Sequence, residues 1–249
     1  MEKMSQAQIA IVAGTGIADL FNVKQFEEFN TSYGPSSLGR LRIGSRDVII
    51  LLRHGIGYTI PPHRINYRAN IFSLKESGVK SIFASSAVGS MRRSMKPGDL
   101  VLVDQVVDFT KGRSQTYFDG ESGKVVFTDV TNPYSDHLRH VILKATKKLH
   151  VKMHQKGTYL CTEGPRFETA GEIRLFRKLG CDVVGMTGCP EVFLARELGM
   201  DYASIAIVTN WAAGIAQKVT HEEVLEMMRE KGPIAKLIIE EAISSIGEK

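Results

Sequence analysis

The stretch most informative about the fold class is Ile9-Ala10-Ile11-Val12-Ala13-Gly14-Thr15-Gly16, a short apolar run that ends in a glycine turn. Six more apolar runs rich in β-branched residues follow it, at 47–52, 81–85, 100–107, 158–161, 182–186 and 202–208. Segments with helical periodicity alternate with several of these runs, at 65–76, 137–149, 170–179, 190–198 and 220–246. Strands that alternate with helices predict an α/β fold whose largely parallel sheet is covered on both faces.

Length and composition bound the domain organisation and the partners. The 249 residues are 43% hydrophobic, which is enough for one sizeable core, and we predict a single domain over residues 1–249. The net charge is +5, but the 32 Lys and Arg residues are scattered among 27 acidic residues. Because no basic stripe forms, the charge pattern argues against a nucleic-acid partner and suits a small anionic substrate.

The lack of an apolar targeting segment and the pattern of cysteines predict a cytoplasmic protein. Residues 1–8 are polar, and no apolar run approaches the roughly 18 residues of a membrane span, so we expect no membrane association. The three cysteines, Cys161, Cys181 and Cys189, are widely spaced and form no C-x-x-C pair. We therefore predict neither a disulfide framework nor a structural zinc site, and we interpret the cysteines as small buried residues.

Polar groups follow three successive strands in the first half of the chain. The first strand ends in Gly14-Thr15-Gly16, the second in Arg53-His54, and the third runs into 85–90, which holds Ser86 and Ala87. Ligands of open α/β sheets bind outside the carboxyl ends of strands. Taken singly, these are an ordinary turn, a surface pair and a flexible loop. Together they offer hydroxyls, backbone amides and a guanidinium to one tetrahedral anion, which predicts a phosphate site.

The glycine turn also has a dinucleotide-binding interpretation, which the sequence disfavours. In the G-x-G-x-x-G pattern the third glycine stands at the start of the helix whose N-terminus holds the pyrophosphate. Here Asp19 occupies that position, and its carboxylate would repel the pyrophosphate. A nicotinamide-dependent oxidoreductase is therefore not favoured.

The second half of the chain supplies groups suited to a heterocycle. Phe167 offers a stacking face, while Glu168 and Asn210 offer a carboxylate and an amide that match the edge of a base. The plainer interpretations are a solvated loop carboxylate for Glu168 and a turn residue for Asn210. The longest irregular stretch, 110–134, is long enough to have a functional or subunit-bridging role.

At these positions the chain resembles the trimeric purine nucleoside phosphorylase and methylthioadenosine phosphorylase family over almost its whole length. The most specific stretches are Gly14-Thr15-Gly16, Arg53-His54-Gly55, Asn66-Tyr67-Arg68-Ala69-Asn70, Pro97-Gly98-Asp99, Glu163-Gly164-Pro165-Arg166-Phe167 and Met186-Thr187 with Pro190-Glu191. The resemblance implies one α/β domain around a mixed, barrel-like sheet flanked by helices. It also implies a homotrimer or homohexamer with active sites near subunit contacts.

The resemblance also implies roles for individual residues. Those around phosphate would be Thr15, Arg53, His54, Ser86, Ala87 and Thr187. Met186 would lie beneath the ribose and Phe167 against the base. Inorganic phosphate is then a co-substrate, and no metal or organic cofactor is required. In such a phosphorolysis His54 and Arg53 would hold phosphate in line, Asn210 would stabilise the departing base, and Glu168 would orient it.

Substrate choice within the family depends on the base pocket. The regions 105–120 and 157–167 look like the methylthioadenosine branch, but that branch has aspartates where this chain has Asn210 and Ala212, and a serine where it has Glu168. Hypoxanthine and guanine carry a proton on N1 that Glu168 can accept, whereas adenine presents a lone pair there. A mismatched buried polar group costs about 1–3 kcal/mol. We therefore predict a 6-oxopurine nucleoside as substrate.

The ribose 5′ position leaves alternatives open. His221 matches the histidine that the 6-oxopurine branch places near the 5′-hydroxyl, although a solvent-exposed histidine at a helix start is the plainer interpretation. 5′-Methylthioinosine stays open as a substrate, as do deoxyribose nucleosides and a methylthioadenosine phosphorylase activity. A nucleoside-binding protein without turnover is the alternative of another class, and an intact phosphate site argues against it.

Overall fold

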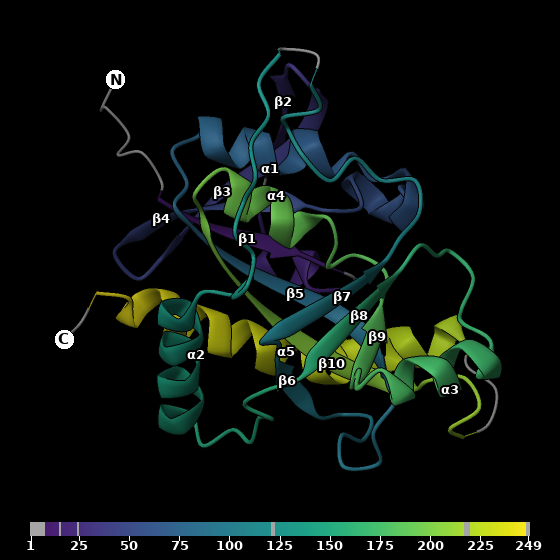
Figure 1. The fold of residues 1–249 in the computed structure, drawn as a ribbon. Helices are drawn as coiled ribbons and strands as arrows, with labels where there is room; N and C mark the ends of the chain where they lie inside the picture. The colour runs from purple at the N-terminus through teal and green to yellow at the C-terminus, as the bar shows by residue number, and fades with distance from the viewer. Residues whose placement is uncertain (1–7, 15, 24, 121–122, 217–219, 248–249) are drawn as a thin grey trace.

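The computed structural model describes residues 8–14, 16–23, 25–120, 123–216 and 220–247. In this part of the chain a large mixed sheet is flanked by five α-helices, which confirms the predicted α/β class (Figure 1). The strands are β1 (Ile9–Ala13), β2 (Phe26–Thr31), β3 (Gly34–Ile43), β4 (Arg46–Leu52), β5 (Ser81–Ser90), β6 (Leu100–Leu102), β7 (Gln105–Phe109), β8 (Thr158–Thr162), β9 (Val183–Gly185) and β10 (Asp201–Trp211). The helices are α1 (Tyr67–Glu76), α2 (Asp136–Lys148), α3 (Ala170–Lys178), α4 (Glu191–Glu197) and α5 (His221–Ser245).

The sheet divides at its longest central strands. The strand order is β2-β3-β4-β1-β5-β9-β8-β7, and β10 pairs with β5 and β6. β1 accompanies β5 only as far as the pair Val12↔Ala84, whereas β10 follows β5 to the pair Trp211↔Ser90. The second half of β5 therefore runs beyond the ends of β1 and β4, and the sheet has a step where side chains from several strand ends meet.

The core lies on both faces of the sheet because the side chains of each strand alternate between them. On β1, Ala10 and Val12 pack with α1 and α4, whereas Ile9, Ile11 and Ala13 pack with α2 and α5. Figure 1 shows α1 and α4 on one side of the sheet and α2 and α5 on the other. A smaller cluster lies beneath α3. A buried sheet of this kind gives the strand ends a rigid base.

The structure differs from the sequence prediction in three segments. The hairpin of β2 and β3 lies in residues 22–45, for which no strand is predicted, because its strands are half-exposed and mix polar with apolar residues. The predicted strand 100–107 is two strands, β6 and β7, which pair with different neighbours. The strand predicted at 81–85 continues to Ser90, so 85–90 is the second half of β5 and not a flexible loop, since both β10 and β9 pair with it.

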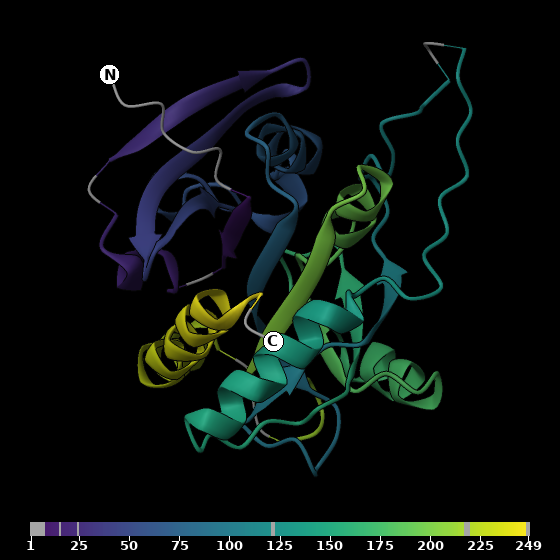
Figure 2. The ribbon, with the colours of Figure 1, turned by 90° about the vertical axis from the view of Figure 1, so that its left-hand side faces the viewer.

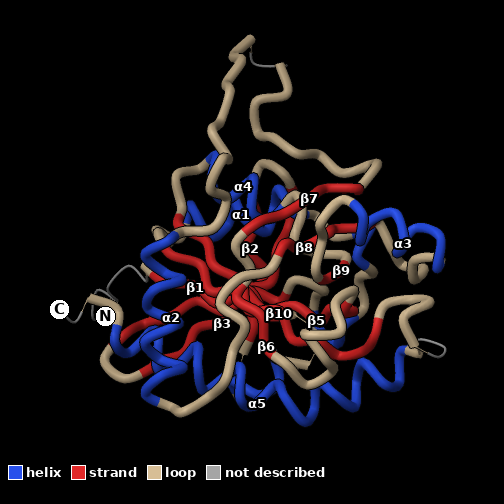
Figure 3. The backbone as a smooth tube through the Cα atoms, turned by 60° about the horizontal axis from the view of Figure 1, so that its bottom comes forward, coloured by secondary structure: helices blue, strands red, loops and turns tan. Residues whose placement is uncertain are grey.

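Described residues of the irregular stretch at 110–134 extend away from the body of the molecule (Figures 2 and 3), although Tyr117 and Tyr134 of the same stretch are buried. Its start is held to the body through Arg113, while Val125 and Phe127 are 70% and 95% exposed. Among the described residues, no helix combines the length and apolar character needed to cross a bilayer.

Candidate active site

A cavity of about 370 Å³ lies at the step in the sheet. Every predicted site residue within the described chain lines it, namely Arg53, His54, Ser86, Ala87, Phe167, Glu168, Met186, Thr187, Asn210, Ala212 and His221. Thr15 lies outside the described residues. The fold thus gathers side chains from β4, β5, β10, α5 and the segments after β8 and β9 into one site.

Arg53, just after β4, lies at the buried end of the cavity and is only 2% exposed. Its Nε and Nη2 atoms each donate to the carboxylate of Glu191 at 2.7 Å, and Nη1 donates to the Ser85 carbonyl at 2.8 Å. Burial alone would lower the pKa of Arg53, but the Glu191 charge and hydrogen bonds hold that pKa above its ordinary value. The predicted fork for phosphate is therefore partly taken up by Glu191, and only the remaining N–H donors can serve a ligand.

The glycine turn after β1 makes room for this arginine. A side chain at Gly14 would come within 2.7 Å of the Ser85 carbonyl oxygen and 3.0 Å of Arg53 Nη1. The Gly14 amide, predicted as a phosphate donor, instead donates to Ser85 Oγ at 3.3 Å. The role of Gly14 in the structure is thus to allow close packing between β1, β5 and Arg53.

His54 has a defined tautomer. Its Nδ1 lies 2.9 Å from the Ile60 carbonyl oxygen, which can only accept, so Nδ1 carries the proton. Burial lowers the pKa of His54 to about 4, and the Arg53 charge acts in the same direction. The neutral ring, 4.3 Å from the Tyr58 ring between centroids, therefore offers Nε2 as an acceptor at neutral pH. The predicted donation from His54 to phosphate requires a second proton on the ring.

Ser86, on the second half of β5, offers a free hydroxyl to the cavity. Its Oγ is buried and has no hydrogen-bond partner among the described residues, although it lines the cavity. A buried hydroxyl without a partner costs about 1–3 kcal/mol. A ligand oxygen at this position would satisfy it, and Ala87 and Thr187 line the same region.

The other end of the cavity carries the groups suited to a base. Glu168, half-buried, accepts from Thr162 Oγ1 at 2.6 Å, and burial raises its pKa. Asn210, at the end of β10, accepts from Thr209 Oγ1 at 2.8 Å and donates from Nδ2 to the Trp211 carbonyl at 2.9 Å. One N–H of the Asn210 amide is left for a ligand. Phe167 is 38% exposed at the mouth.

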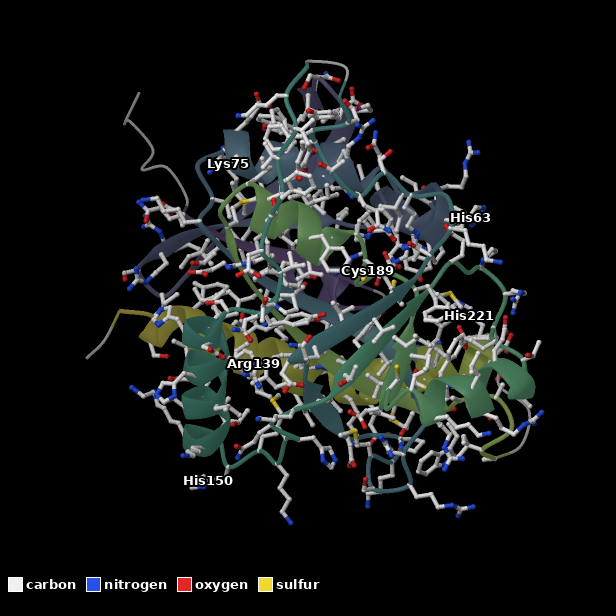
Figure 4. The ribbon with its side chains drawn as sticks, in the orientation of Figure 1. His63, Lys75, Arg139, His150, Cys189 and His221 are labelled. Carbon is white, nitrogen blue, oxygen red and sulfur yellow. The ribbon has the colours of Figure 1, made fainter. Side chains whose placement is uncertain are left out.

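Met186 and His221 complete the lining. Arg113 Nη1 donates to the backbone carbonyl of Met186 at 2.8 Å. The same nitrogen also donates to the Cys189 carbonyl at 2.6 Å. His221, labelled in Figure 4, is the first residue of α5 and is exposed. It nevertheless lines the cavity. Figure 4 also shows Cys189 within the molecule.

Four residues that support the site are absent from the sequence prediction. Glu191 and Tyr202 stand behind Arg53, Thr162 holds Glu168, and Arg113 links the segments after β8 and β9. Glu191 belongs to the conspicuous Pro190-Glu191 pair, which could have indicated it. Arg113, in an irregular stretch, gives no such signal.

One group of described residues has the composition of a metal site. Ligand atoms of Asp108, Cys161 and Cys189 lie within 4.8 Å of one another. Arg113 Nη1 lies 3.9 Å from Cys161 Sγ, and a guanidinium at that distance disfavours a cation.

Comparisons with known proteins agree on one family. The family model of the phosphorylase superfamily matches residues 8–244. A 6-oxopurine nucleoside phosphorylase of Pyrococcus furiosus is 51% identical over 240 residues, which are 93% of this chain and 91% of that protein. A probable S-methyl-5′-thioinosine phosphorylase of Methanocaldococcus jannaschii is 43% identical, with 97% and 94% covered. The structure of methylthioadenosine phosphorylase from Schistosoma mansoni in complex with adenine matches with a TM-score of 0.92 at 32% identity, and the match covers 98% of this chain and 93% of that one.

Proposed function

This chain belongs to the phosphorylase superfamily, and from that premise we propose that it is a purine nucleoside phosphorylase acting on 6-oxopurine nucleosides. The reaction transfers the pentosyl group of inosine or guanosine from the base to inorganic phosphate. The relatives named above as phosphorylases support this assignment, as does the pairing of a phosphate-type end with a base-type end in one cavity.

The observation that carries the proposal is the unpartnered Ser86 hydroxyl beside a buried arginine. Arg53 is bonded to Ser85, the neighbour of Ser86, whereas Asn210 lies against Gly89, three residues further along β5, so the cavity has a phosphate-type end and a base-type end. A receptor for nucleosides alone has no need of an anion site next to the sugar. Phosphate and nucleoside bound together place nucleophile and glycosidic bond in one enclosed space.

The chemistry follows from this arrangement. A phosphate oxygen forms a bond to C1′ of the ribose as the bond between C1′ and N9 breaks, and the bonding electrons leave with the purine. Arg53 stabilises the phosphate charge, and neutral His54 accepts from the hydroxyl of hydrogen phosphate. The free N–H of Asn210 donates to N7 or O6 as negative charge develops on the base. The purine anion then takes up a proton and leaves as the neutral base.

Base selection depends on the protonation at N1. A carboxylate at Glu168, with one oxygen held by Thr162, can accept the N1 proton of hypoxanthine or guanine. Adenine would present a lone pair to the same oxygen, and such a mismatch costs about 1–3 kcal/mol. This favours 6-oxopurines although relatives with methylthioadenosine activity share the fold.

The 5′ substituent is a second choice within the same reaction. His221 lies at the cavity beside the buried, apolar Val224, so a hydroxyl and a methylthio group each have a partner there. The Methanocaldococcus relative is named as a probable S-methyl-5′-thioinosine phosphorylase, and 5′-methylthioinosine is therefore the alternative substrate of this proposal.

A substrate panel tests the assignment. Inosine, guanosine, adenosine, methylthioadenosine and methylthioinosine are each assayed for release of free base with and without phosphate. We expect phosphate-dependent release from the 6-oxopurine nucleosides. Release that is equal without phosphate, or binding of nucleoside without any release, would overturn the assignment in favour of a hydrolase or a binding protein.

We further propose a homotrimer or homohexamer that works in the cytoplasm without a metal or organic cofactor. The family resemblance and the exposed Val125 and Phe127 on the extended stretch support the oligomer. The buried cysteines, all without a disulfide, suit a reducing compartment. Light scattering at decreasing protein concentration should give a trimer or a multiple of it, and a monomer that stays fully active would contradict the oligomer.

A further inference from the structure

A buried acid stands directly behind the arginine at the phosphate end. Glu191 is 0% exposed, its two carboxylate oxygens accept from Nε and Nη2 of Arg53, and Tyr202 donates its hydroxyl to Glu191 Oε1 at 2.5 Å. The three side chains come from the end of β4, the start of α4 and β10. They form a continuous buried line that ends at the cavity.

Stability alone is a poor reason for this arrangement. Taking two charges out of water costs about as much as their attraction returns, and apolar residues of the same volume often stabilise a core equally well. An arginine cannot release its proton to escape the penalty. A buried Arg–Glu pair retained at a ligand cavity therefore points to a role in what the arginine does.

The geometry defines that role. Hydrogen bonds along the Nε–Nη2 edge fix the rotation of the guanidinium plane, and the Ser85 carbonyl fixes Nη1. The donors left over belong to Nη1 and Nη2, and they are held on the side away from Glu191. Ser86 Oγ, the unpartnered hydroxyl of the same cavity, follows Ser85 directly in β5.

We infer that Glu191 and Tyr202 are positioning residues for phosphate, which hold the guanidinium of Arg53 so that its free donors meet the anion. This inference rests on the proposed phosphorolysis. Neither residue touches substrate. Their loss should weaken phosphate binding selectively, because the base end has its own supports in Thr162 and Thr209.

The sharper variant for the test is Tyr202→Phe, which keeps the ring in the core and removes only the hydroxyl that donates to Glu191. We expect the phosphate KM to rise about threefold to tenfold, because the lost hydroxyl acts on phosphate only through Glu191 and Arg53 and so transmits only part of the loss typical of a hydrogen bond to a charged group. The inosine KM should change less than twofold. The matched control is Tyr117→Phe, which removes a buried tyrosine hydroxyl bonded to the Arg68 carbonyl outside the cavity.

Glu191→Gln gives the larger effect. An amide can accept from only one of the two donors of Arg53, and its own NH₂ group faces the other, so we expect the phosphate KM to rise at least about tenfold. If this variant does not fold, Tyr202→Phe alone decides. A fall in the phosphate KM would overturn the inference, because it would mean that the negative charge of Glu191 weakens the attraction between Arg53 and phosphate. Equal rises in both KM values would also overturn it, as a purely structural role predicts.

Calorimetry separates this inference from the proposed function. Phosphate and hypoxanthine are each titrated into the wild type and both variants without any turnover. Weaker phosphate binding with unchanged hypoxanthine binding supports the positioning role even if no nucleoside is cleaved. Unchanged phosphate binding in variants that fold overturns it even if the wild type is an active phosphorylase.

Discussion

The two ends of the cavity are built from different parts of the fold. At the phosphate end, Arg53, His54 and Ser86 are 2%, 5% and 4% exposed and lie on or directly after the central strands β4 and β5. At the base end, Phe167 is 38% exposed, and with Glu168 it lies on the segment after β8. One end is part of the core, and the other is partly a surface loop.

The supports of the functional groups differ in the same way. Arg53 is held by a charged partner that is itself fully buried, whereas Glu168 and Asn210 are held by neutral groups. These groups are the Thr162 hydroxyl for Glu168, and the Thr209 hydroxyl and the Trp211 carbonyl for Asn210. A change at the phosphate end should therefore affect both activity and stability. A change at the base end should alter selectivity while the fold is kept, because loops tolerate substitution better than packed strands.

The largest effect is expected for Arg53→Ala. The variant loses the charged donors that face phosphate, and we expect kcat/KM for phosphate to fall at least about a thousandfold, with the phosphate KM strongly raised. It also leaves Glu191 as an unpaired buried charge, so the free energy of unfolding should fall by about 3–5 kcal/mol. Steady-state kinetics and urea unfolding measure the two quantities.

Arg92→Ala is the control for this arginine. Arg92 pairs with Asp182 at 2.8 Å outside the cavity, and its side chain is 42% exposed, so its loss should leave the phosphate KM unchanged. If Arg53→Ala behaved like this control, the phosphate end would be wrongly assigned.

The next effect concerns the base end. Wild-type kcat/KM for inosine should exceed that for adenosine by at least about a hundredfold, and the double change Glu168→Ser with Asn210→Asp should narrow the ratio. It removes the carboxylate that faces N1 and supplies an acid that can protonate adenine at N7. The methylthioadenosine branch has a second aspartate where this chain has Ala212, and the double variant still lacks it. We therefore do not expect the double change to convert the specificity fully to adenosine.

Specificity constants for both nucleosides decide this prediction. A wild type that prefers adenosine, or a ratio untouched by the double change, would show that the carboxylate does not read N1. The phosphate KM of the double variant serves as an internal control, since the phosphate end is not altered.

A smaller effect is expected when only the support of the base end is removed. Thr162→Val keeps the shape of the side chain but removes the hydroxyl that donates to Glu168 at 2.6 Å. We expect kcat/KM for inosine to fall about tenfold through the nucleoside KM, with the phosphate KM unchanged. A rise confined to the phosphate KM would contradict the division of the cavity into two independently supported ends.

The smallest effect is a pH dependence of stability from His54. Its pKa is about 4 in the folded protein, below the ordinary 6.5 of an unfolded chain, so the unfolded state binds more protons between these values. The free energy of unfolding should therefore decrease as the pH falls from about 7 to about 5.5, by about 1 kcal/mol from this group. Urea unfolding at both pH values measures it.

His54→Gln should remove that part of the pH dependence. His140→Gln, at an exposed position of α2, controls for the loss of one imidazole. If both variants retained the wild-type slope, the neutral His54 inferred at the phosphate end would be wrong.

Local sequence pattern was enough for β1, β4 and β8 and for the five described helices. β1 has the predicted bounds, and β4, β8 and all five described helices differ from their predictions by no more than two residues at either end. Apolar runs and helical periodicity can be recognised within a short stretch of sequence, so they predict a strand or a helix even when its neighbours in the fold are not known. β2 and β3 lack such a pattern, since their half-exposed residues are stabilised by pairing with β4.

In the candidate site, too, some features could be predicted from the sequence and others could not. The kinds of groups needed for an anion and a base stand at strand ends in the sequence, so Arg53, Ser86, Glu168 and Asn210 could be named from it. Their hydrogen-bond partners could not. Arg53 and Glu191 are 138 residues apart, and only the folded chain brings the end of β4 and the start of α4 within hydrogen-bond distance.

The sequence by itself determined the class of fold, the order of its helices and of most of its strands, and the chemistry available at the strand ends, because these follow from local periodicity and residue type. Only the tertiary structure decided which donors remain free for a ligand. It directs the fork of Arg53 to Glu191, the Gly14 amide to Ser85 and His54 Nδ1 to Ile60, and it leaves Ser86 Oγ without a partner among the described residues. Hydrogen bonds are short and directional, so a donor's availability depends on which distant groups the packed core places within about 3 Å of it.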